Sequence, residues 1–344
     1  MEDIKEYTLL ELKKVIEKKG YPSFYAQQIF GWIYKQRQEE FELMTNISKE
    51  ARRWFKKTFY FSRLNLVKRE VSCDGTTKFI FELSDGEKIE TVLIPEGRRQ
   101  TLCLSTQVGC KFRCRFCVSG LNGWVRDLTT SEIVNQYLEV ERVIKPVKVT
   151  NIVFMGIGEP LDNFNNVVKS ILILSEPYGI YLGKRRICIS TIGLIPQIER
   201  LRKANLGVKL SLSLHAGDNQ TREKIISVSK RYPLDELMKV VRRFSWEDKH
   251  PLTFEYLMIR GLNSKREDAL KLVRLVKNIN CKINLIPYNS SPYFNWQPPL
   301  EEEIQEFKDV LKKHNVFFTL RKPRGRDINA ACGQLRAYFL KRDK

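Results

Sequence analysis

Three cysteines of one short stretch, GCKFRCRFC, have a spacing that suits metal binding: Cys110, Cys114 and Cys117. Thiolates so close in sequence can form one face of a soft metal site. A structural zinc site uses four protein ligands, usually in two pairs, and the sequence around the stretch holds neither a second cysteine pair nor a histidine. Three thiolates on an iron–sulfur cluster would instead leave one iron open to a substrate. The spacing therefore favours a cluster with an open site.

Polar residues follow several apolar segments along the chain and are candidates for one ligand pocket. Glu159, in the Gly-rich stretch MGIGEP, could accept a hydrogen bond from a ligand amino group, and glycine there lets a ligand approach the backbone closely. Taken singly, each polar residue could be an ordinary loop residue. Taken together, they describe one pocket, made of Gly158, Glu159, Ser190, Ser213, Leu214, His215 and Asn289.

Two further cysteines lie outside the triad. Cys332, in RGRDINAACGQL, stands between small residues and before a glycine, so that a reactive centre could reach it, although a buried cysteine starting a terminal helix is the more ordinary interpretation. Cys103 lies on the apolar segment 101–106, and its surroundings alone indicate a core residue. Cys73, Cys188 and Cys281 are expected to be structural.

The elements that would position these residues alternate between strand and helix from residue 101 onward. Strands are expected at 101–106, 151–156, 186–191, 208–215, 252–259 and 282–288, and amphipathic helices at 198–205, 234–244, 266–278 and 300–314. Repeated βα units indicate a parallel sheet, either doubly wound or a partial barrel, with chemistry at the strand ends. We expect an α/β fold with a partial (β/α)6 barrel.

Two smaller regions precede this core in the sequence. Residues 1–62 are expected to form a helical domain, with helices at 23–38 and 46–59, the latter capped by Ser48. Residues 63–100 carry two Asp-Gly pairs between apolar alternations, at 74–75 and 85–86, which indicates antiparallel hairpins. The predicted division is therefore 1–62, 63–100 and 101–344.

The composition indicates a globular protein rather than a membrane or secreted one, and its charge fits either a merely basic protein or one with a polyanionic partner, without naming a particular nucleic acid. The 344 residues include 60 Lys and Arg against 40 Asp and Glu, a net charge of +20, which favours a polyanionic partner. No apolar run approaches the roughly 18 residues that a membrane span needs, and the amino-terminal stretch is charged throughout. We expect a cytoplasmic protein. Arg52, Arg53, Lys56 and Lys57, on the segment 46–59, are candidate RNA contacts.

The motifs together resemble the radical SAM (S-adenosylmethionine) superfamily and, within it, the RlmN-type adenine carbon-2 methyltransferases, with the Cfr-type carbon-8 methyltransferases as close relatives. The resemblance covers nearly the whole chain and rests on LCLSTQVGCKFRCRFC, FMGIGEPL, SLSLHA, EYLMIRGLN, NLIPYN and RGRDINAACGQL. It implies methylation of adenosine 2503 of 23S rRNA and of adenosine 37 of tRNA. It also implies one 4Fe–4S cluster per chain, on Cys110, Cys114 and Cys117, and two SAM molecules consumed per turnover.

The resemblance assigns roles to three further residues. Cys332 would carry a methyl group from a first SAM, and a radical derived from a second SAM would convert that methyl into a methylene that adds to adenine. Glu90, which alone looks like a solvated strand carboxylate, would accept the ring proton. Cys103 would then release the product by forming a transient disulfide with Cys332. Electrons would come from a donor such as flavodoxin or ferredoxin, and a monomer is expected.

Three alternatives remain at this stage. The chain could be a non-enzymatic RNA-binding protein with a structural metal, or a radical SAM enzyme acting on a peptide or small molecule. The +20 charge and Cys332 argue against the latter, since such substrates need no basic face. A Cfr-type carbon-8 methyltransferase of 23S rRNA is separated least well by sequence.

Overall fold

The amino-terminal region is helical, as expected. The computed structural model describes residues 1–247 and 251–335. Three α-helices lie in this region: α1 (Leu9–Lys18), α2 (Phe24–Phe30) and α3 (Lys49–Thr58). Helix α2 continues into a π-helical turn at Gly31–Lys35, so the predicted helix at 23–38 is confirmed in large part. Two short strands, β1 (Glu2–Asp3) and β2 (Phe59–Tyr60), pair in parallel and close the region.

The helix starts follow from capping residues. The side chain of Thr8 accepts a hydrogen bond from the Glu11 N–H and Glu11 reaches back to Thr8, which is a complete capping box for α1. The Ser48 hydroxyl accepts from the Ala51 N–H at the start of α3, so the predicted cap is confirmed.

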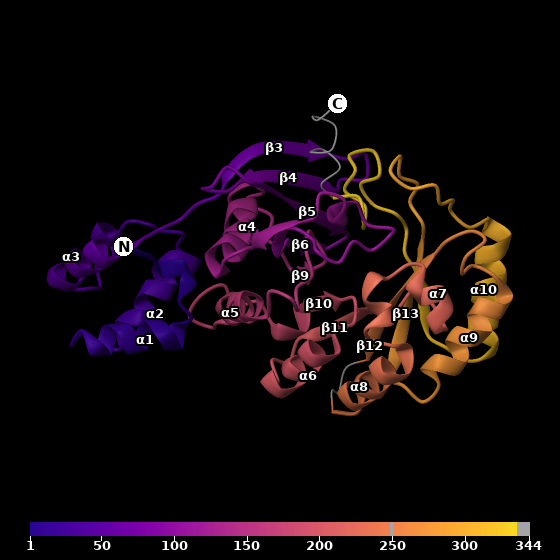
Figure 1. Ribbon diagram of the computed structural model, residues 1–344. Coiled ribbons are helices and arrows are strands. Elements are labelled where there is room, and N and C mark those ends of the chain that lie inside the picture. The colour runs from indigo at the N-terminus through magenta and orange to yellow at the C-terminus, as the bar shows by residue number, and fades with distance from the viewer. Residues whose placement is uncertain (248–250, 336–344) are drawn as a thin grey trace.

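One ten-stranded sheet forms the body of the molecule, and Figure 1 shows its strands following one another in an arc. From one edge to the other, its order is β14 (Phe318–Leu320), β13 (Cys281–Pro287), β12 (Leu252–Met258), β11 (Lys209–Ser213), β10 (Ile187–Thr191), β9 (Asn151–Phe154), β6 (Arg99–Cys103), β5 (Lys88–Glu96), β4 (Thr77–Glu82) and β3 (Asn65–Val71). The six predicted strands pair in parallel, from β6 to β13. The partial barrel is thus confirmed, with β14 added at its edge.

The two predicted hairpins are present, and they extend the same sheet. Strands β3 and β4 pair antiparallel around the turn at 72–76, and β4 and β5 pair around the turn at 83–87. Strand β5 then pairs antiparallel with β6, placing Val92 opposite Cys103. The region at 63–100 therefore joins the barrel directly at the strand that carries Cys103.

Seven helices of the described chain fill the connections: α4 (Thr130–Val143), α5 (Phe164–Ser175), α6 (Ile195–Ala204), α7 (Asn219–Glu223), α8 (Leu234–Glu247), α9 (Arg266–Val276) and α10 (Glu301–Lys313). The predicted helices at 198–205, 234–244, 266–278 and 300–314 are confirmed. Helix α6 starts earlier than expected because Pro196 stands in its first turn, where the missing N–H costs nothing.

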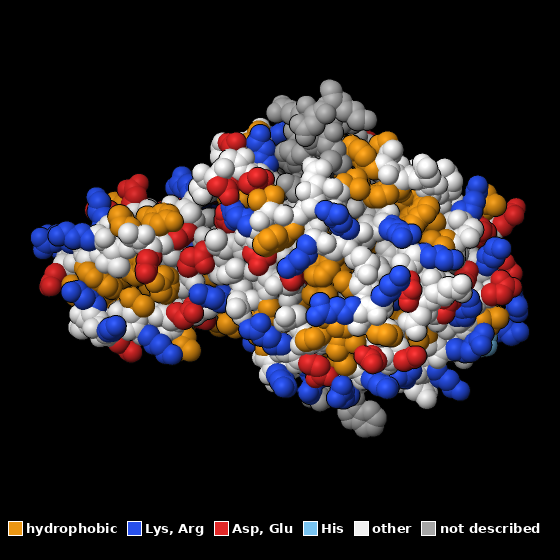
Figure 2. Space-filling view, viewed as in Figure 1, with side chains coloured by type: hydrophobic (Ala, Val, Ile, Leu, Met, Phe, Trp, Pro, Cys, Tyr) orange, Lys and Arg blue, Asp and Glu red, His pale blue; other side chains and the backbone are white. Residues whose placement is uncertain are grey.

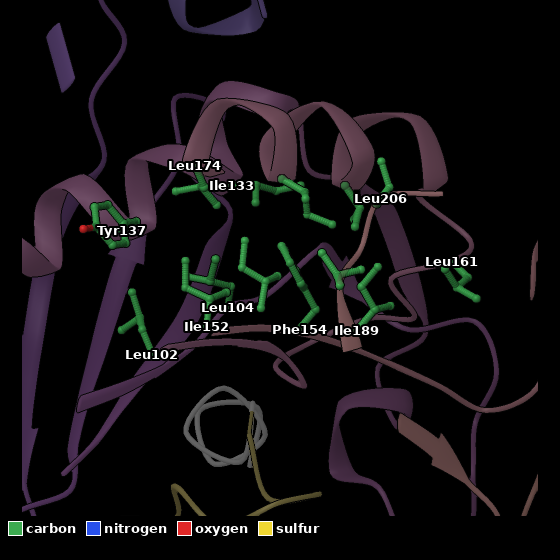
Figure 3. Close-up of a cluster of buried hydrophobic side chains, with 14 of the residues drawn as sticks. Leu102, Leu104, Ile133, Tyr137, Ile152, Phe154, Leu161, Leu174, Ile189 and Leu206 are labelled. Carbon is green, nitrogen blue, oxygen red and sulfur yellow. The ribbon is translucent and has the colours of Figure 1, made fainter. Parts of the chain in front are cut away.

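The core lies between the strands and helices of the barrel. Figure 3 shows Leu102, Ile152, Phe154 and Ile189 of the strands facing a layer of helices that includes Ile133. Fully burying each such side chain contributes about 1.5–3 kcal/mol. Residues alternate sides along a strand, so Cys103, Val153 and Met155 face the opposite side of the sheet. That opposite side is where the candidate site lies.

A buried lysine joins the amino-terminal region to the barrel. The Lys5 ammonium, fully buried, donates to Glu39 at 2.6 Å, to the Ser62 carbonyl at 2.7 Å and to Asn135 of α4 at 2.8 Å. In the described part of the chain, no helix has the length and apolar character needed to cross a membrane.

Candidate active site

The three clustered cysteines lie on the loop between strands β7 (Gln107–Gly109) and β8 (Trp124–Asp127). The loop bends back on itself, with positive φ at Gly109 (77°) and Arg113 (43°). Its backbone is fixed by the Cys117 N–H donating to the Cys114 carbonyl, and by the Arg115 N–H donating to the Ile225 carbonyl. Cys114 is buried, and Cys110 and Cys117 are partly buried.

This donor set fits a cluster better than a single ion. Burial raises the pKa of Cys110, and the sulfurs of Cys117 and Cys114 add to that rise, so the three thiols are electrostatic neighbours. Within residues 1–247 and 251–335, no three His, Cys, Asp or Glu side chains converge on a point as a single metal ion requires. An iron–sulfur cubane is held by thiolates at separate irons, so its ligands stand farther apart.

A cavity of about 140 Å³ opens beside this loop at the ends of the barrel strands. Five of the residues singled out in the sequence line it: Gly158, Glu159, Ser190, Ser213 and His215. Cys117 and Cys332 also line it. The cavity thus brings Cys117 of the cysteine loop, the strand-end polar groups and Cys332 to one space.

Two glycines keep the backbone close at the edge of this cavity. A Cβ on Gly156 would lie 2.6 Å from the Leu104 carbonyl oxygen, which leaves no room for a side chain. Gly158 has φ +103°, and a Cβ there would lie 2.6 Å from Gln107. The Gly-rich stretch is therefore needed to bring β9 against the strand that leads into the cysteine loop.

Glu159 is buried and already holds two strand ends together. Its carboxylate accepts from the Leu161 N–H at 3.1 Å and from the Ile192 N–H at 3.0 Å. Burial raises the pKa of Glu159 to about 7, although the Thr191 hydroxyl and both N–H donors oppose that rise. Carboxylate lone pairs that these donors leave over can still accept from a ligand in the cavity.

His215 presents a buried nitrogen to the same cavity. Its Nδ1 accepts from the Leu257 N–H at 3.0 Å, so in the neutral ring the proton lies on Nε2. Burial, and then the charge of Arg222, lowers the pKa of His215 to about 3. Nε2 has no hydrogen-bond partner and is buried, which leaves an N–H donor without an acceptor until a ligand supplies one.

Arg222, which the sequence analysis did not single out, organises the backbone around His215. This fully buried guanidinium donates to the carbonyls of Leu214, Ser213 and Ile192 and to the Ser229 hydroxyl. It thereby fixes the ends of β10 and β11 in relation to each other. The one sequence signal that could have distinguished Arg222 from other arginines is its position on α7 (Asn219–Glu223), a short helix that Asp218 caps.

Cys332 is exposed and is held against the cysteine loop, and the described chain around it, up to residue 335, forms turns rather than a terminal helix. The expectation of a buried cysteine starting a helix is therefore wrong. The Val118 N–H donates to the Gly333 carbonyl at 2.7 Å, and the Ser119 hydroxyl donates to the Leu335 carbonyl at 3.2 Å. These contacts place Cys332 directly beside the last cluster cysteine.

Cys332 also lines a second, narrower cavity of about 30 Å³, and Cys103 lines that cavity together with Val92 and Asn289. Burial, with Cys332 close by, raises the pKa of the Cys103 thiol to about 12. The Arg321 guanidinium is within hydrogen-bonding reach of the Cys332 sulfur and lines both cavities. Arg321 follows β14, a strand too short to be recognised in the sequence, so it was missed.

Two of the candidate pocket residues lie apart from the cavity beside the cysteine loop. The Leu214 side chain is in the hydrophobic core, and only its backbone takes part, accepting from Arg222. Asn289 lines the narrower cavity and accepts from Arg326 at 2.6 Å.

Glu90 is fully buried, which corrects the interpretation of a solvated strand carboxylate. Five consecutive residues of β5, at 89–93, are buried, so both faces of the strand are covered there. The ammonium of Lys78, on β4, lies 3.6 Å from the carboxylate.

The remaining cysteines differ from one another in their surroundings. Cys281 packs against the main core, Cys188 is partly buried on β10, and Cys73 is exposed in the turn between β3 and β4. The structural role expected for Cys73 therefore does not come from core packing.

Known families match both parts of the chain. A family model described as the Radical SAM superfamily matches residues 104–273. A second model, described as the ribosomal RNA large subunit methyltransferase N-terminal domain, matches residues 3–60. The two matches divide the chain as the helical region and the barrel do.

Full-length relatives show the same likeness. The dual-specificity RNA methyltransferase RlmN of Geotalea uraniireducens is 45% identical over 334 residues, covering 97% of this chain and 96% of that protein. A probable dual-specificity RNA methyltransferase RlmN of Caldanaerobacter subterraneus subsp. tengcongensis is 42% identical, covering 99% of both. The crystal structure of a radical SAM methyltransferase from Sphaerobacter thermophilus superposes with a TM-score of 0.91 at 38% identity, covering 98% of this chain and 100% of that one.

Proposed function

This chain belongs to the RlmN family of radical SAM RNA methyltransferases, and from that premise we propose that it methylates carbon-2 of an adenosine in 23S rRNA and in tRNA through a methyl group carried by Cys332. The position of Cys332 carries the proposal. Its side chain lines the cavity beside the cluster loop and also the cavity that holds Cys103. The proposed reaction requires the Cys332 thiol to reach both the methyl donor and the second thiol, Cys103, which releases the product from it.

The cofactors fit the residues that line the larger cavity. Cys110, Cys114 and Cys117 would hold one 4Fe–4S cluster, which supplies the electron that splits SAM into methionine and a carbon radical. SAM would be held by Glu159 through its remaining lone pairs, by the Nε2–H of His215 and by the hydroxyls of Ser190 and Ser213. The glycines at 156 and 158, which line this cavity, let the strand that carries Glu159 pack against the segment leading into the cysteine loop. Two SAM molecules are consumed in each turnover.

Cys332 performs the first transfer. Its thiolate displaces S-adenosylhomocysteine from the methyl group of a first SAM. Carbon-2 of adenine is electrophilic, so the methyl cannot pass to it by ordinary displacement. Hydrogen abstraction from the methyl on Cys332 gives a methylene that adds to carbon-2 and forms a new carbon–carbon bond.

Glu90 and Cys103 complete the reaction. The adduct loses its ring proton, which the Glu90 carboxylate accepts, and one electron, which the cluster held by Cys110, Cys114 and Cys117 would take back. Attack of the Cys103 thiolate on the Cys332 sulfur then breaks the carbon–sulfur bond, and the carbon takes up a proton to become the methyl group. A disulfide between Cys103 and Cys332 remains, and two electrons from a donor such as flavodoxin or ferredoxin restore both thiols.

The RNA would meet the protein through the helical amino-terminal region and the mouth of the cavity. The target adenine has to leave its stack to reach the methylene on Cys332. We place this reaction in the cytoplasm, where both RNA substrates are found, and we propose that the enzyme acts as a monomer.

Two cysteine variants test the proposal. Cys103→Ala keeps methyl transfer and radical addition but removes the thiol that releases the product. It should therefore accumulate protein joined covalently to RNA, seen as a slowly migrating, nuclease-sensitive band. Cys332→Ala should transfer methyl to neither protein nor RNA. Cys281→Ala, a thiol packed on the main core, is the control and should show neither defect. Normal turnover of Cys103→Ala without an adduct would rule out the two-thiol reaction.

A further inference from the structure

A buried cation lies beside Glu90, and the reaction described above gives it no role. Lys78, on β4, is 2% exposed. Its ammonium donates to the Ile328 carbonyl at 2.6 Å, and it lies 3.0 Å from Glu70 and 3.6 Å from Glu90. A buried ammonium is costly unless it is paired and hydrogen-bonded, and these three oxygens meet that need.

The three partners of Lys78 come from three parts of the chain. Glu70 lies on β3 and Glu90 on β5, while Ile328 lies four residues before Cys332. Lys78 therefore ties the carboxylate of Glu90 to the segment that carries the methyl-bearing sulfur.

The turn between β3 and β4 also makes hydrogen bonds to the segment that precedes Cys332, at residues 325 and 327. The Ser72 hydroxyl donates to Asp327 at 2.6 Å, and the Cys73 N–H donates to Asp327 at 3.1 Å. The Gly325 N–H donates to Asp74 at 3.0 Å. Among these contacts to residues 325–328, the hydrogen bond from Lys78 to Ile328 is the one whose donor also lies close to the Glu90 carboxylate.

The strand register places this ammonium at the side of the Cys103 cavity. Glu90 and Val92 point to the same face of β5, because side chains alternate along a strand. Val92 lines the cavity that Cys103 and Cys332 share, and Lys78 is its direct partner on β4. The charge of Lys78 thus lies next to the place where the adenine ring must lose its proton.

We propose that Lys78 is a positioning residue for this proton transfer: its ammonium keeps the Glu90 carboxylate ionised and fixed in relation to Cys332. The inference rests on the proposed function, in which Glu90 accepts the ring proton. A cation within about 4 Å favours the charged form of a carboxylate, which is the form that can accept a proton. The hydrogen bond to the Ile328 carbonyl sets where that carboxylate stands relative to the carbon–sulfur bond.

Other charged and titratable groups surround Glu90 and stay in place when Lys78 is replaced. Glu70 faces the same ammonium and is paired with Lys68 on β3. Arg321, Cys103 and Cys332 line the adjoining cavity. Replacing Lys78 by a neutral residue therefore removes the cation that lies 3.6 Å from Glu90 while it leaves these groups unchanged.

The test is the pH dependence of ring-proton loss in a single turnover. Holoenzyme methylated at Cys332 is mixed with SAM, reductant and an RNA fragment deuterated at adenine carbon-2, and loss of deuterium to solvent is followed. For Lys78→Met, we expect the acid limb of the rate profile to move to higher pH by about one to three units. Lys78→Arg, which keeps a cation, should restore the wild-type limb.

Three further variants separate the possible outcomes. Asp327→Asn loosens the Cys332 segment without touching Glu90, so it should slow the reaction at every pH and leave the limb in place. Glu90→Gln should abolish deuterium loss; if it does not, the proposed function and this inference both fail. If Glu90→Gln is inactive but Lys78→Met keeps the wild-type limb, only the role of Lys78 is wrong. Should Lys78→Met not fold, Lys78→Gln with Glu70→Gln replaces it, with one carboxylate fewer to bury.

Discussion

In the proposed reaction, the sulfur of Cys332 meets a methyl donor, an adenine ring and a second thiol, although it lies on a turn rather than on a helix or strand. Backbone hydrogen bonds compensate for that. The Gly333 carbonyl is tied to the loop that follows Cys117, and residues 325–328 are tied to the β3–β4 hairpin. Cys332 is thus held in position from both sides by hydrogen bonds to other parts of the fold. Reactive residues on loops are commonly positioned by a rigid scaffold in this way.

His215 gives a pH-dependent stability that can be measured. Burial beside Arg222 lowers its folded pKa to about 3, whereas an unfolded chain has a value of about 6.5. Between these values, the unfolded chain binds a proton that the folded chain does not. The free energy of unfolding should therefore fall as the pH drops from about 6.5 towards 3, by at most about 1.4 kcal/mol per unit from this residue, and its contribution is complete above pH 6.5.

Urea unfolding over this pH range checks that expectation against His215→Asn. Asparagine tolerates the positive φ of 58° at this position and does not titrate. The variant should lose less stability on acidification than the wild type. Parallel curves for the two proteins would show that His215 is protonated, or exposed, in the folded state.

The three cysteines of the loop should act as one unit in iron binding. Replacing Cys110, Cys114 or Cys117 by Ala removes one thiolate from a site that has three, so each variant should lose both iron and SAM cleavage. Iron content and the visible absorption of the reconstituted protein measure the first effect, and release of methionine measures the second. Cys188→Ala, on a barrel strand away from the loop, is the control. A single triad variant with full iron content and turnover would contradict the assignment.

At the scale of helices and strands, the elements that could be predicted are those that a local sequence pattern marks. The parallel strands were apparent because apolar runs end at turn residues, and α3 was apparent because Ser48 marks its start. The alternation along β6 could also have shown that Cys103 faces away from Leu102, yet its environment alone indicated core. Strand β14 was missed because three residues carry no periodic signal.

The site itself was predictable only in part. The triad and the strand-end groups follow from short motifs, but partners that meet across long separations carry no local signal. Lys78 is 250 residues from Ile328, and Ser72 is 255 from Asp327, so their contacts appear only once β3–β5 join the barrel. The burial of Glu90 likewise depends on which strands flank β5.

Helix α3 provides a prediction about RNA. Lys56 is paired with Glu42, and Arg52 donates to the Glu42 carbonyl, so part of its charge is already engaged. Reversing Arg52, Arg53, Lys56 and Lys57 should weaken RNA binding and reduce the slope of log affinity against log salt by about one for each phosphate that the protein no longer neutralises. Cluster assembly should be unchanged.

The matched control reverses four cations at the other end of the molecule, namely Arg266, Lys308, Lys312 and Lys313 on α9 and α10 (Figure 1). This set should leave the salt slope almost unaltered. If the α9–α10 set flattens the slope and the α3 set does not, the RNA lies on the barrel side instead.

On the one face of the molecule that is drawn in space-filling form, the positive charge is distributed rather than confined to one stripe. On the face shown in Figure 2, Lys and Arg side chains are interspersed with acidic ones over both the helical region and the barrel. The excess of +20 therefore acts as a long-range attraction for RNA. The buried Lys5, which links Glu39, Ser62 and Asn135, fixes the helical region to the barrel.

The identity of the methylated base tests the central claim most directly. Purified, reconstituted enzyme is incubated with SAM, a reductant and separate fragments of 23S rRNA and tRNA, and the digested nucleosides are resolved by liquid chromatography and mass spectrometry against authentic isomers. We predict 2-methyladenosine from both RNAs, with the methyl carbon derived from SAM by way of Cys332. 8-Methyladenosine, or an adenosine methylated on nitrogen, would contradict the account.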